Sequence, residues 1–369
     1  MRRYLPFLYI ALFLFITNFQ QAFSQGCVGI KNMHCTSMSP ASKPDKWQVS
    51  LNHRYFRSYK HFVGSDEQKQ RVDQGTEVIN KVHSIDLGVS YNVSNRLALS
   101  LSFPILLNDR SSLYEHYGNS TSSNPQQLRF HTQANGLGDI RIAGTYWILE
   151  PLKHPNGNFA IGFGLKLPNG NPEVNDDFHR RKTNGSDSMI RKAVDQSIQL
   201  GDGGLGFSLE TQGYHSLFKN AVLYYNGFYL FNPANTNKTL TRGTLTGADP
   251  LIAYYSVPDQ FSFRLGMNYN LLQNKRLTAS FGGRLEGIPA HDALGKSKGF
   301  RRPGYIISIE PGASYKAGKA NFQLSVPVAL YRNRTKSVYD LADPTHTRHG
   351  DAAFADYLLN IGMSYSFGK

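Results

Sequence analysis

Residues 97–106 read LALSLSFPIL, and large apolar side chains occupy every second position. They are Leu97, Leu99, Leu101, Phe103 and Ile105, and they alternate with Ala98, Ser100, Ser102 and Pro104. Successive side chains of a β-strand point to opposite faces of the sheet. The stretch therefore predicts a strand with one apolar face and one water-facing face.

The same alternation returns along the whole chain and predicts twelve strands of about ten residues. Their ranges are 47–56, 82–93, 97–106, 138–148, 158–167, 204–214, 221–231, 261–271, 276–287, 304–315, 320–331 and 357–367. Range 221–231 is the least regular, because apolar side chains occupy both of its faces. Strands of soluble sheets usually have about five or six residues, whereas about nine to eleven tilted residues cross a bilayer. The strand length therefore favours a membrane barrel over a soluble sandwich.

Short and long connections alternate between the predicted strands. The short ones are 94–96, 150–157, 215–220, 272–275 and 316–319, and the long ones are 57–81, 107–137, 168–203, 232–260, 288–303 and 332–356. Bacterial outer-membrane barrels have short periplasmic turns and long extracellular loops. The fold class that follows is all-β: a closed antiparallel transmembrane β-barrel of about twelve strands with both ends in the periplasm.

The first residues have the features of an export signal. Arg2 and Arg3 precede an apolar stretch at 4–16, and Ala22-Phe23-Ser24 places small residues at a cleavage site. The apolar stretch is too short to remain as a membrane-spanning helix. We therefore predict a signal peptide at 1–24, a periplasmic segment at 25–46 that could plug the barrel, and the barrel itself at 47–369. The expected location is the outer membrane of a Gram-negative-type bacterium.

The last strand supports this location. Apolar residues alternate from Tyr357 to Phe367, and only Gly368 and Lys369 follow the final aromatic residue. Outer-membrane barrels commonly end in such a strand, which the insertion machinery recognises. This machinery is therefore an expected partner.

Ten charged residues fall on the predicted water-facing sides of the strands, five of them cationic and five anionic. They are Arg54, Asp86, Asp139, Arg141, Lys166, Glu210, Arg264, Arg284, Glu286 and Glu310. Charges inside a barrel need water or an opposite charge. They could form salt bridges that make the barrel rigid, or a polar conduit that selects solutes. Arg264 and Arg284 would face each other across adjacent strands, so a linked ionic patch with Glu286 and Glu310 is expected.

The chain has a formal net charge of +14, and three of the long loops contain basic runs. The basic runs 179–182, 296–302 and 332–336 would face the phosphate-rich outer leaflet, so membrane lipids and lipopolysaccharide are expected partners. Two polar clusters in loops, at 176–179 and 346–351, could bind a cation, but solvated loop residues are the more common case. The glycine runs 136–138 and 201–206 precede strands rather than helices, which favours tight turns over a nucleotide site. We predict no metal, no cofactor and no nucleic-acid partner.

Three local features together resemble one family. Gly136-Leu137-Gly138-Asp139-Ile140 opens a strand that ends in Tyr146-Trp147, Leu165-Lys166-Leu167-Pro168-Asn169-Gly170 ends the next strand, and a glycine-rich entry at 201–206 opens the following one. This succession, over about residues 130–230, resembles the outer-membrane proteins named for the meta-cleavage pathway of phenol degradation. They are neighbours of the FadL-like transporters of hydrophobic solutes. The resemblance implies a barrel that passes small hydrophobic or aromatic compounds, although its strand count departs from the fourteen of FadL-type barrels.

Three functions remain open on the sequence. The first is a channel for small solutes with a charged lumen, and the second is a non-conducting structural or adhesive barrel that binds surface lipid or polysaccharide. The third, an outer-membrane phospholipase-type enzyme, would use His83-Ser84 or His215-Ser216. Adjacent strand residues point to opposite faces, so neither pair can act as neighbours. We therefore predict that the protein is not an enzyme.

The two cysteines, Cys27 and Cys35, are expected to form a disulfide after export. Residues 24–27 faintly resemble a lipoprotein cleavage site, and Cys27, His34 and Cys35 could contribute to a metal site. Mass spectrometry of the non-reduced N-terminal peptide should show a mass two hydrogen atoms below that of the dithiol. Two free thiols would exclude the disulfide, and a lipid on Cys27 would show that the cleavage site lies elsewhere.

Overall fold

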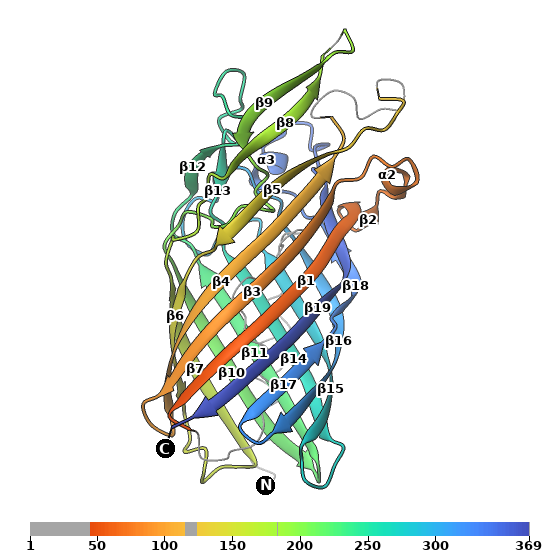
Figure 1. The fold of residues 1–369 in the computed structure, drawn as a ribbon. Helices are drawn as coiled ribbons and strands as arrows, with labels where there is room; N and C mark the ends of the chain where they lie inside the picture. The colour runs from red at the N-terminus through yellow and green to blue at the C-terminus, as the bar shows by residue number, and fades with distance from the viewer. Residues whose placement is uncertain (1–44, 115–123, 183, 369) are drawn as a thin grey trace.

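Twelve antiparallel strands close into a barrel in the computed structural model, which describes residues 45–114, 124–182 and 184–368 (Figure 1). Ten of the barrel strands are continuous. They are β1 (Trp47–Val63), β3 (Ile79–Asn92), β4 (Leu97–Ser112), β7 (Gly157–Lys166), β10 (Gly206–Phe218), β11 (Ala221–Phe231), β14 (Gln260–Asn270), β15 (Leu277–Ile288), β16 (Gly304–Ala317) and β19 (Ala352–Phe367). The other two are interrupted, as β5 (Phe130–Leu137) with β6 (Arg141–Trp147), and β17 (Ala320–Ser325) with β18 (Val328–Asn333). The predicted fold class is confirmed.

The barrel closes where the first strand pairs with the last. β1 and β19 run antiparallel from Trp47 opposite Phe367 to Phe62 opposite Ala352. Each neighbouring pair in the sheet follows the chain order, so every barrel strand has two partners. This closure leaves no sheet edge within the hydrocarbon.

Proline and glycine mark both interruptions. β5 and β6 both pair with β4, and between them the N–H of Gly138 donates to the carbonyl oxygen of Pro104 at 2.8 Å. A Cβ at Gly138 would lie only 3.1 Å from the carbonyl oxygen of Leu200, so no larger residue fits there without a shift. Between β17 and β18 lies Pro327, which has no N–H to donate. The run 136–138, predicted as a tight turn at the rim, is therefore a break within a strand.

All twelve predicted ranges correspond to barrel strands, and the differences lie at the extracellular ends. β1 continues to Val63, β4 continues to Ser112, and β19 begins at Ala352. The predicted loop 107–137 contains the end of β4 and all of β5, which pair with each other. Strands that extend beyond the membrane have no lipid-facing side, so their sequences lack the alternation that located the rest.

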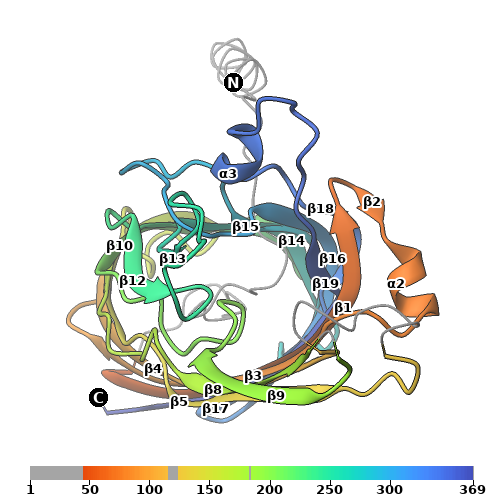
Figure 2. The same cartoon turned by 90° about the horizontal axis from the view of Figure 1, so that it is seen from above.

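The remaining elements lie in the long loops, at the end of the barrel opposite the short turns (Figure 1). They are β2 (Asp66–Glu67), α2 (Lys69–Asp73), the hairpin β8 (Asn175–Arg181) with β9 (Asp187–Ala193), the pair β12 (Thr236–Leu240) with β13 (Tyr254–Ser256), and α3 (Val338–Leu341). Figure 2 shows β12, β13 and neighbouring segments folded across part of the barrel mouth. None of the helices in the described ranges is long and apolar enough to cross a membrane.

The outer face of the barrel carries apolar side chains between two groups of aromatic rings. Phe163 and Ile161 on β7 are 56% and 47% exposed, as lipid-facing residues should be. Trp47 contacts Tyr91 at the periplasmic end, with ring centroids 4.6 Å apart, and Tyr305 lies 5.7 Å from Tyr331 at the other end. Aromatic residues at both interfaces are typical of outer-membrane barrels.

Barrel closure can be tested with a disulfide across the β1–β19 seam. Leu51 lies opposite Met363, and both side chains point outward. Directly opposed strand residues lie within the Cα separation that a disulfide requires. In a background without Cys27 and Cys35, Leu51→Cys with Met363→Cys should cross-link on oxidation. The boiled protein should then migrate faster than its reduced form on a denaturing gel, because the chain is a ring.

The matched control combines Leu51→Cys with Tyr365→Cys, since Tyr365 lies opposite Val49, two positions away on the same face. This pair should cross-link much less. Equal cross-linking of the two pairs would contradict the observed register, and no cross-link in either would contradict the closure.

Candidate functional site

A linked ionic cluster lies on the inner wall formed by β14, β15 and β16. Arg264 donates two hydrogen bonds to Glu310, both of 2.8 Å. Arg284 donates to Glu286 at 2.6 Å and also approaches Glu310 at 3.8 Å. The structure therefore brings together the four groups of the predicted ionic patch.

The strand register explains this arrangement. Arg264 lies directly opposite Arg284, and like charges in that relation repel. Glu310 on the next strand reaches both guanidinium groups and compensates them. Arg284 and Glu310 are each only 1% exposed, so solvent screens this cluster very little.

A second cluster lies on β6, β7 and β10, which only β11 separates from the strands of the first cluster. Arg141 pairs with Glu210, and Lys166 pairs with Asp202 while lying 3.8 Å from Asp139. Asp139 also accepts a hydrogen bond from the N–H of Gly170 at 2.9 Å. Asp202 was not among the predicted lumen residues, because it lies in the glycine run 201–206, which was interpreted only as a turn. No local signal marks Asp202, because its partner Lys166 lies 36 positions away in the chain.

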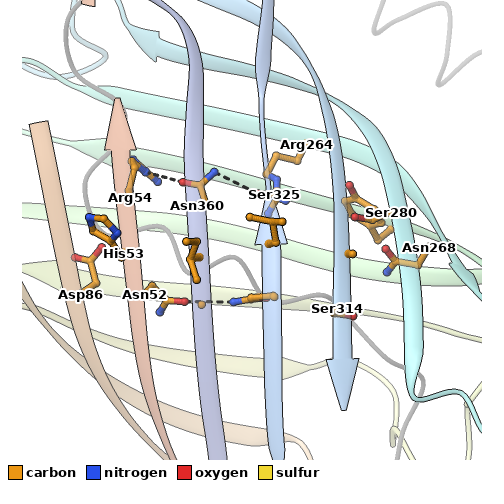
Figure 3. Close-up of a pocket in the computed structure, with 16 residues that line it drawn as sticks. Asn52, His53, Arg54, Asp86, Arg264, Asn268, Ser280, Ser314, Ser325 and Asn360 are labelled. Atoms are coloured by element: carbon orange, nitrogen blue, oxygen red, sulfur yellow. Dashed lines mark hydrogen bonds between the residues drawn. The ribbon is translucent and has the colours of Figure 1, made fainter. Parts of the chain in front are cut away.

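The last two predicted residues, Arg54 and Asp86, line a small cavity of about 40 Å³ together with Arg264 (Figure 3). Arg54 donates to the side-chain oxygen of Asn360 at 3.3 Å, and Asp86 accepts from the hydroxyl of Ser84 at 3.3 Å. Arg54 and Asp86 are thus placed beside the first cluster, in the middle of the lumen. The structure therefore groups the ten predicted charges in two regions of the interior.

A larger cavity of about 580 Å³ extends from this region to the periplasmic end. Its lining also includes Asn52, Asn268, Ser314 and Gln323, which line the small cavity, so the two spaces adjoin. We call the larger space the vestibule.

The walls of the vestibule differ in chemistry. One wall carries Trp147, Tyr214, Val222 and Phe228 beside the Arg141–Glu210 pair, and the opposite wall carries Gln48, Ser50, Asn52, Ser364 and Ser366. Val222 and Phe228 belong to β11, the strand whose alternation was least regular. Its inner face is apolar because it forms this wall, which explains why both of its faces carry apolar residues.

Two loop segments fill the extracellular part of the lumen. Val194 and Ile198 are fully buried, and Ile198 packs with Leu106 and Ala134 on the barrel wall. The Asn108 amide donates to the carbonyl oxygen of Ile198 at 2.8 Å. We call residues 194–204 and 253–259 the loop layer.

Side-chain contacts join the two segments of the loop layer. The Tyr255 hydroxyl donates to the carbonyl oxygen of Val194 at 3.1 Å, and the Gln196 amide donates to the carbonyl oxygen of Ser256 at 2.8 Å. The two segments of the loop layer therefore form one packed unit inside the extracellular part of the barrel. The plug predicted from 25–46 falls outside the described residues, except for Asp45 and Lys46.

An ion pair fixes the loop layer at the barrel mouth. Arg302 forms two hydrogen bonds to Asp195, of 2.7 and 2.6 Å, and Arg110 lies 3.5 Å from the same carboxylate. Burial alone would raise the pKa of Asp195, but the charges of Arg110 and Arg302 lower it well below its usual value. Asp195 is therefore ionised at neutral pH.

The basic runs expected to face the outer leaflet turn partly inward. Arg301 is 2% exposed and pairs with Asp292 at 2.6 Å, and Arg302 pairs with Asp195. Arg334 is also buried and lies 3.2 Å from Asp340. Arg302 contacts a distant segment, whereas Arg301 and Arg334 pair with acids of their own loops. These three side chains therefore bind carboxylates of the protein instead of pointing to the outer leaflet.

The candidate catalytic and metal residues lie apart. His83 faces outward and contacts His53 at 3.0 Å, whereas Ser84 faces inward. His179 pairs with Asp187 across the β8–β9 hairpin at 2.8 Å. The described part of the chain brings no three histidine, cysteine, aspartate or glutamate side chains together in a metal-binding group.

Comparison with known proteins relates the chain to others by fold. No family profile and no curated protein matches it. A crystal structure of an outer membrane channel from Pseudomonas putida F1 matches 91% of this chain and 100% of its own, at 12% identity and a TM-score of 0.57. The β-domain of the Bordetella autotransporter BrkA and the CymD monoaromatic hydrocarbon channel each match 88% of this chain and 100% and 90% of their own, at 10% identity and TM-scores of 0.46 and 0.44. At 12% identity, the likeness to the Pseudomonas putida channel shows the fold alone.

The shared role of Glu310 leads to a stability prediction. Glu310→Gln leaves Arg264 and Arg284 facing each other in a buried site, so the free energy of unfolding should fall by about 3 kcal/mol. Replacing both members of the bidentate pair, with Arg264→Met and Glu310→Leu, should cost less, because no guanidinium group then loses its main partner. Urea unfolding in lipid vesicles, followed by tryptophan fluorescence, measures both changes.

The control is Ile309→Val, a lipid-facing neighbour on the same strand, which should cost less than about 1 kcal/mol. A Glu310→Gln protein as stable as this control would show that the cluster does not depend on Glu310.

Proposed function

We propose that this protein is an outer-membrane channel for small solutes, gated at its extracellular end by the loop layer. The observation that carries the proposal is the adjoining pair of cavities, of about 580 and 40 Å³, inside a closed barrel. Twelve strands enclose more space than eight, in which side chains fill the interior, and less than the sixteen to eighteen of porins. The similarity in fold to an outer membrane channel supports the same role.

The vestibule indicates which solutes the channel passes. Its aromatic wall, with Trp147 and Phe228, would stack on a flat apolar body, and its amide and hydroxyl wall would bind a polar substituent. Small aromatic compounds with one polar group fit both walls. The resemblance to the phenol-degradation family implies the same class of compound.

We further propose that the protein lies in the outer membrane. Its partners there would be the membrane lipids, lipopolysaccharide and the insertion machinery, and we propose that it has no catalytic activity.

A second candidate is a structural barrel that does not conduct. The packing of the loop layer favours it, since Val194, Ile198 and Val257 are fully buried at the extracellular end. A sealed barrel would use its loops to bind surface lipid or polysaccharide. Electrical measurement separates the two candidates, because only a channel carries current.

The test is single-channel recording of the purified barrel in planar bilayers. We expect stepwise conductance, and Arg284→Ala should shift the ion selectivity toward cations. The substitution removes one fixed positive charge from the inner wall and leaves Glu286 and Glu310 in place. The reversal potential in a salt gradient measures the shift.

Leu285→Ile is the matched control, because Leu285 is the neighbouring residue on the lipid-facing side, and it should leave the selectivity unchanged. A barrel that is folded but never conducts would favour the structural candidate. A conducting barrel whose selectivity ignores Arg284 would retain the channel and exclude this cluster as its filter.

A further inference from the structure

A third cavity, of about 300 Å³, lies among the extracellular loops above the loop layer. Its lining comes from five separate parts of the chain: 71–78, 110–114, 178–195, 241–255 and 300–302. It shares no lining residue with the two lower cavities. We call this space the outer cup.

Positive charge dominates the outer cup. Its lining contains the cations Arg71, Arg110, Lys192, Arg242 and Arg302, and the acid Asp195. Asp351, which is outside this lining, also pairs with Arg71. Among the described residues, the four arginines of the cup alone still outnumber these two carboxylates. Asp195 compensates at most one of the two arginines that it contacts.

Three of the five cations are held where water screens them little. Lys192 is 7% exposed, and the side chains of Arg110 and Arg302 are 16% and 19% exposed. Interactions between partly buried charges are weakened by salt much less than those at an open surface. The excess charge therefore acts on whatever enters the cup.

Aromatic rings lie beside these cations. The Lys192 ammonium lies 4.5 Å from the centroid of the Phe178 ring, and the Arg302 guanidinium lies 4.8 Å from that of Phe300. Tyr114 and Tyr255 complete the aromatic part of the lining. A cation held against a ring keeps its full charge, so it remains able to attract an anion.

We propose that the outer cup binds small aromatic anions, such as carboxylates, before they enter the channel. The arginines match the two oxygens of a carboxylate, and Phe178 and Phe300 offer faces for its ring. The proposal that the cup supplies the channel with solute rests on the proposed channel function, whereas the proposal that the cup binds an anion does not.

Arg110 points to the inner side of β4. Alternate side chains of this strand share a face, and buried Asn108 faces inward whereas exposed Leu107 faces lipid. The cup therefore opens among the loops and not toward the membrane.

Calorimetric titration of the full-length barrel in detergent with benzoate tests the proposal without requiring conduction. Benzoate should bind, and benzyl alcohol, which has the ring without the charge, should bind at least about tenfold more weakly. Arg242→Gln should weaken benzoate binding about tenfold through the loss of one charge. Arg242 is exposed in a loop, so its replacement leaves the barrel intact.

The control is Arg191→Gln, which removes the same charge from the hairpin that carries Lys192. Arg191 is exposed and pairs with the exposed Asp177, and it does not line the cup. Phe178→Leu should weaken benzoate binding and leave the binding of inorganic phosphate unchanged.

Several results would overturn the proposal. Equal weakening by Arg191→Gln and Arg242→Gln would assign binding to the general surface charge, and phosphate binding as tight as that of benzoate would exclude a role for the rings. Vesicles of anionic phospholipid that compete with benzoate in the wild type, but not in Arg242→Gln, would assign the cup to lipid headgroups. If benzoate binds as proposed and the barrel does not conduct, the cup stands and the channel function fails.

Discussion

Within hydrocarbon, a backbone N–H or C=O without a hydrogen-bond partner costs several kcal/mol, and the rest of this structure depends on that cost. A sheet can avoid it only by closing on itself, which the pairing of β1 with β19 achieves over the whole membrane-spanning length. Closure divides the side chains of every strand into a lipid-facing set and an interior set. The interior side chains do not have to be apolar, so charged residues of the strands can lie on this side.

The interior must still neutralise the charges that it holds. Arg264 and Arg284 face each other because the strand register leaves them no alternative, and Glu310 makes that position tolerable by reaching both. Lys166 on β7 also needs an opposite charge, and Asp202 supplies it from a loop. Each cluster is thus a local solution to a problem that closure creates. Members of both clusters line the adjoining cavities: Arg264 lines the small one, and Arg141 and Glu210 line the vestibule.

The sequence predicts this architecture well where one rule governs many residues. Alternation with a period of two located all twelve strands, since lipid imposes it on every membrane-crossing segment. The prediction failed where contacts join distant parts of the chain. Nothing local in the run 296–302 indicates that Arg302 turns inward to Asp195, more than one hundred positions earlier in the chain. Asp202 was missed for a similar reason, because its partner lies on a strand and its own segment reads as a turn. The predicted disulfide of Cys27 with Cys35 lies outside the described residues.

The three cavities place different chemistry at successive depths. The outer cup carries excess positive charge, the middle of the lumen pairs its cations with acids, and the vestibule offers an aromatic wall opposite a polar one. An anion that moves inward from the cup loses part of its attraction to the cations there. A site that binds the anion too tightly would stop transport. Asp195 moderates this: it takes up the charge of one arginine in the cup and lies at the start of the loop layer. In the proposed channel, the same carboxylate would limit the affinity of the cup for an anion, and its pair with Arg302 anchors the loop layer beneath the cup. An anionic solute that competes with Asp195 for Arg302 would loosen that anchor, and in this way binding in the cup would be coupled to opening of the loop layer.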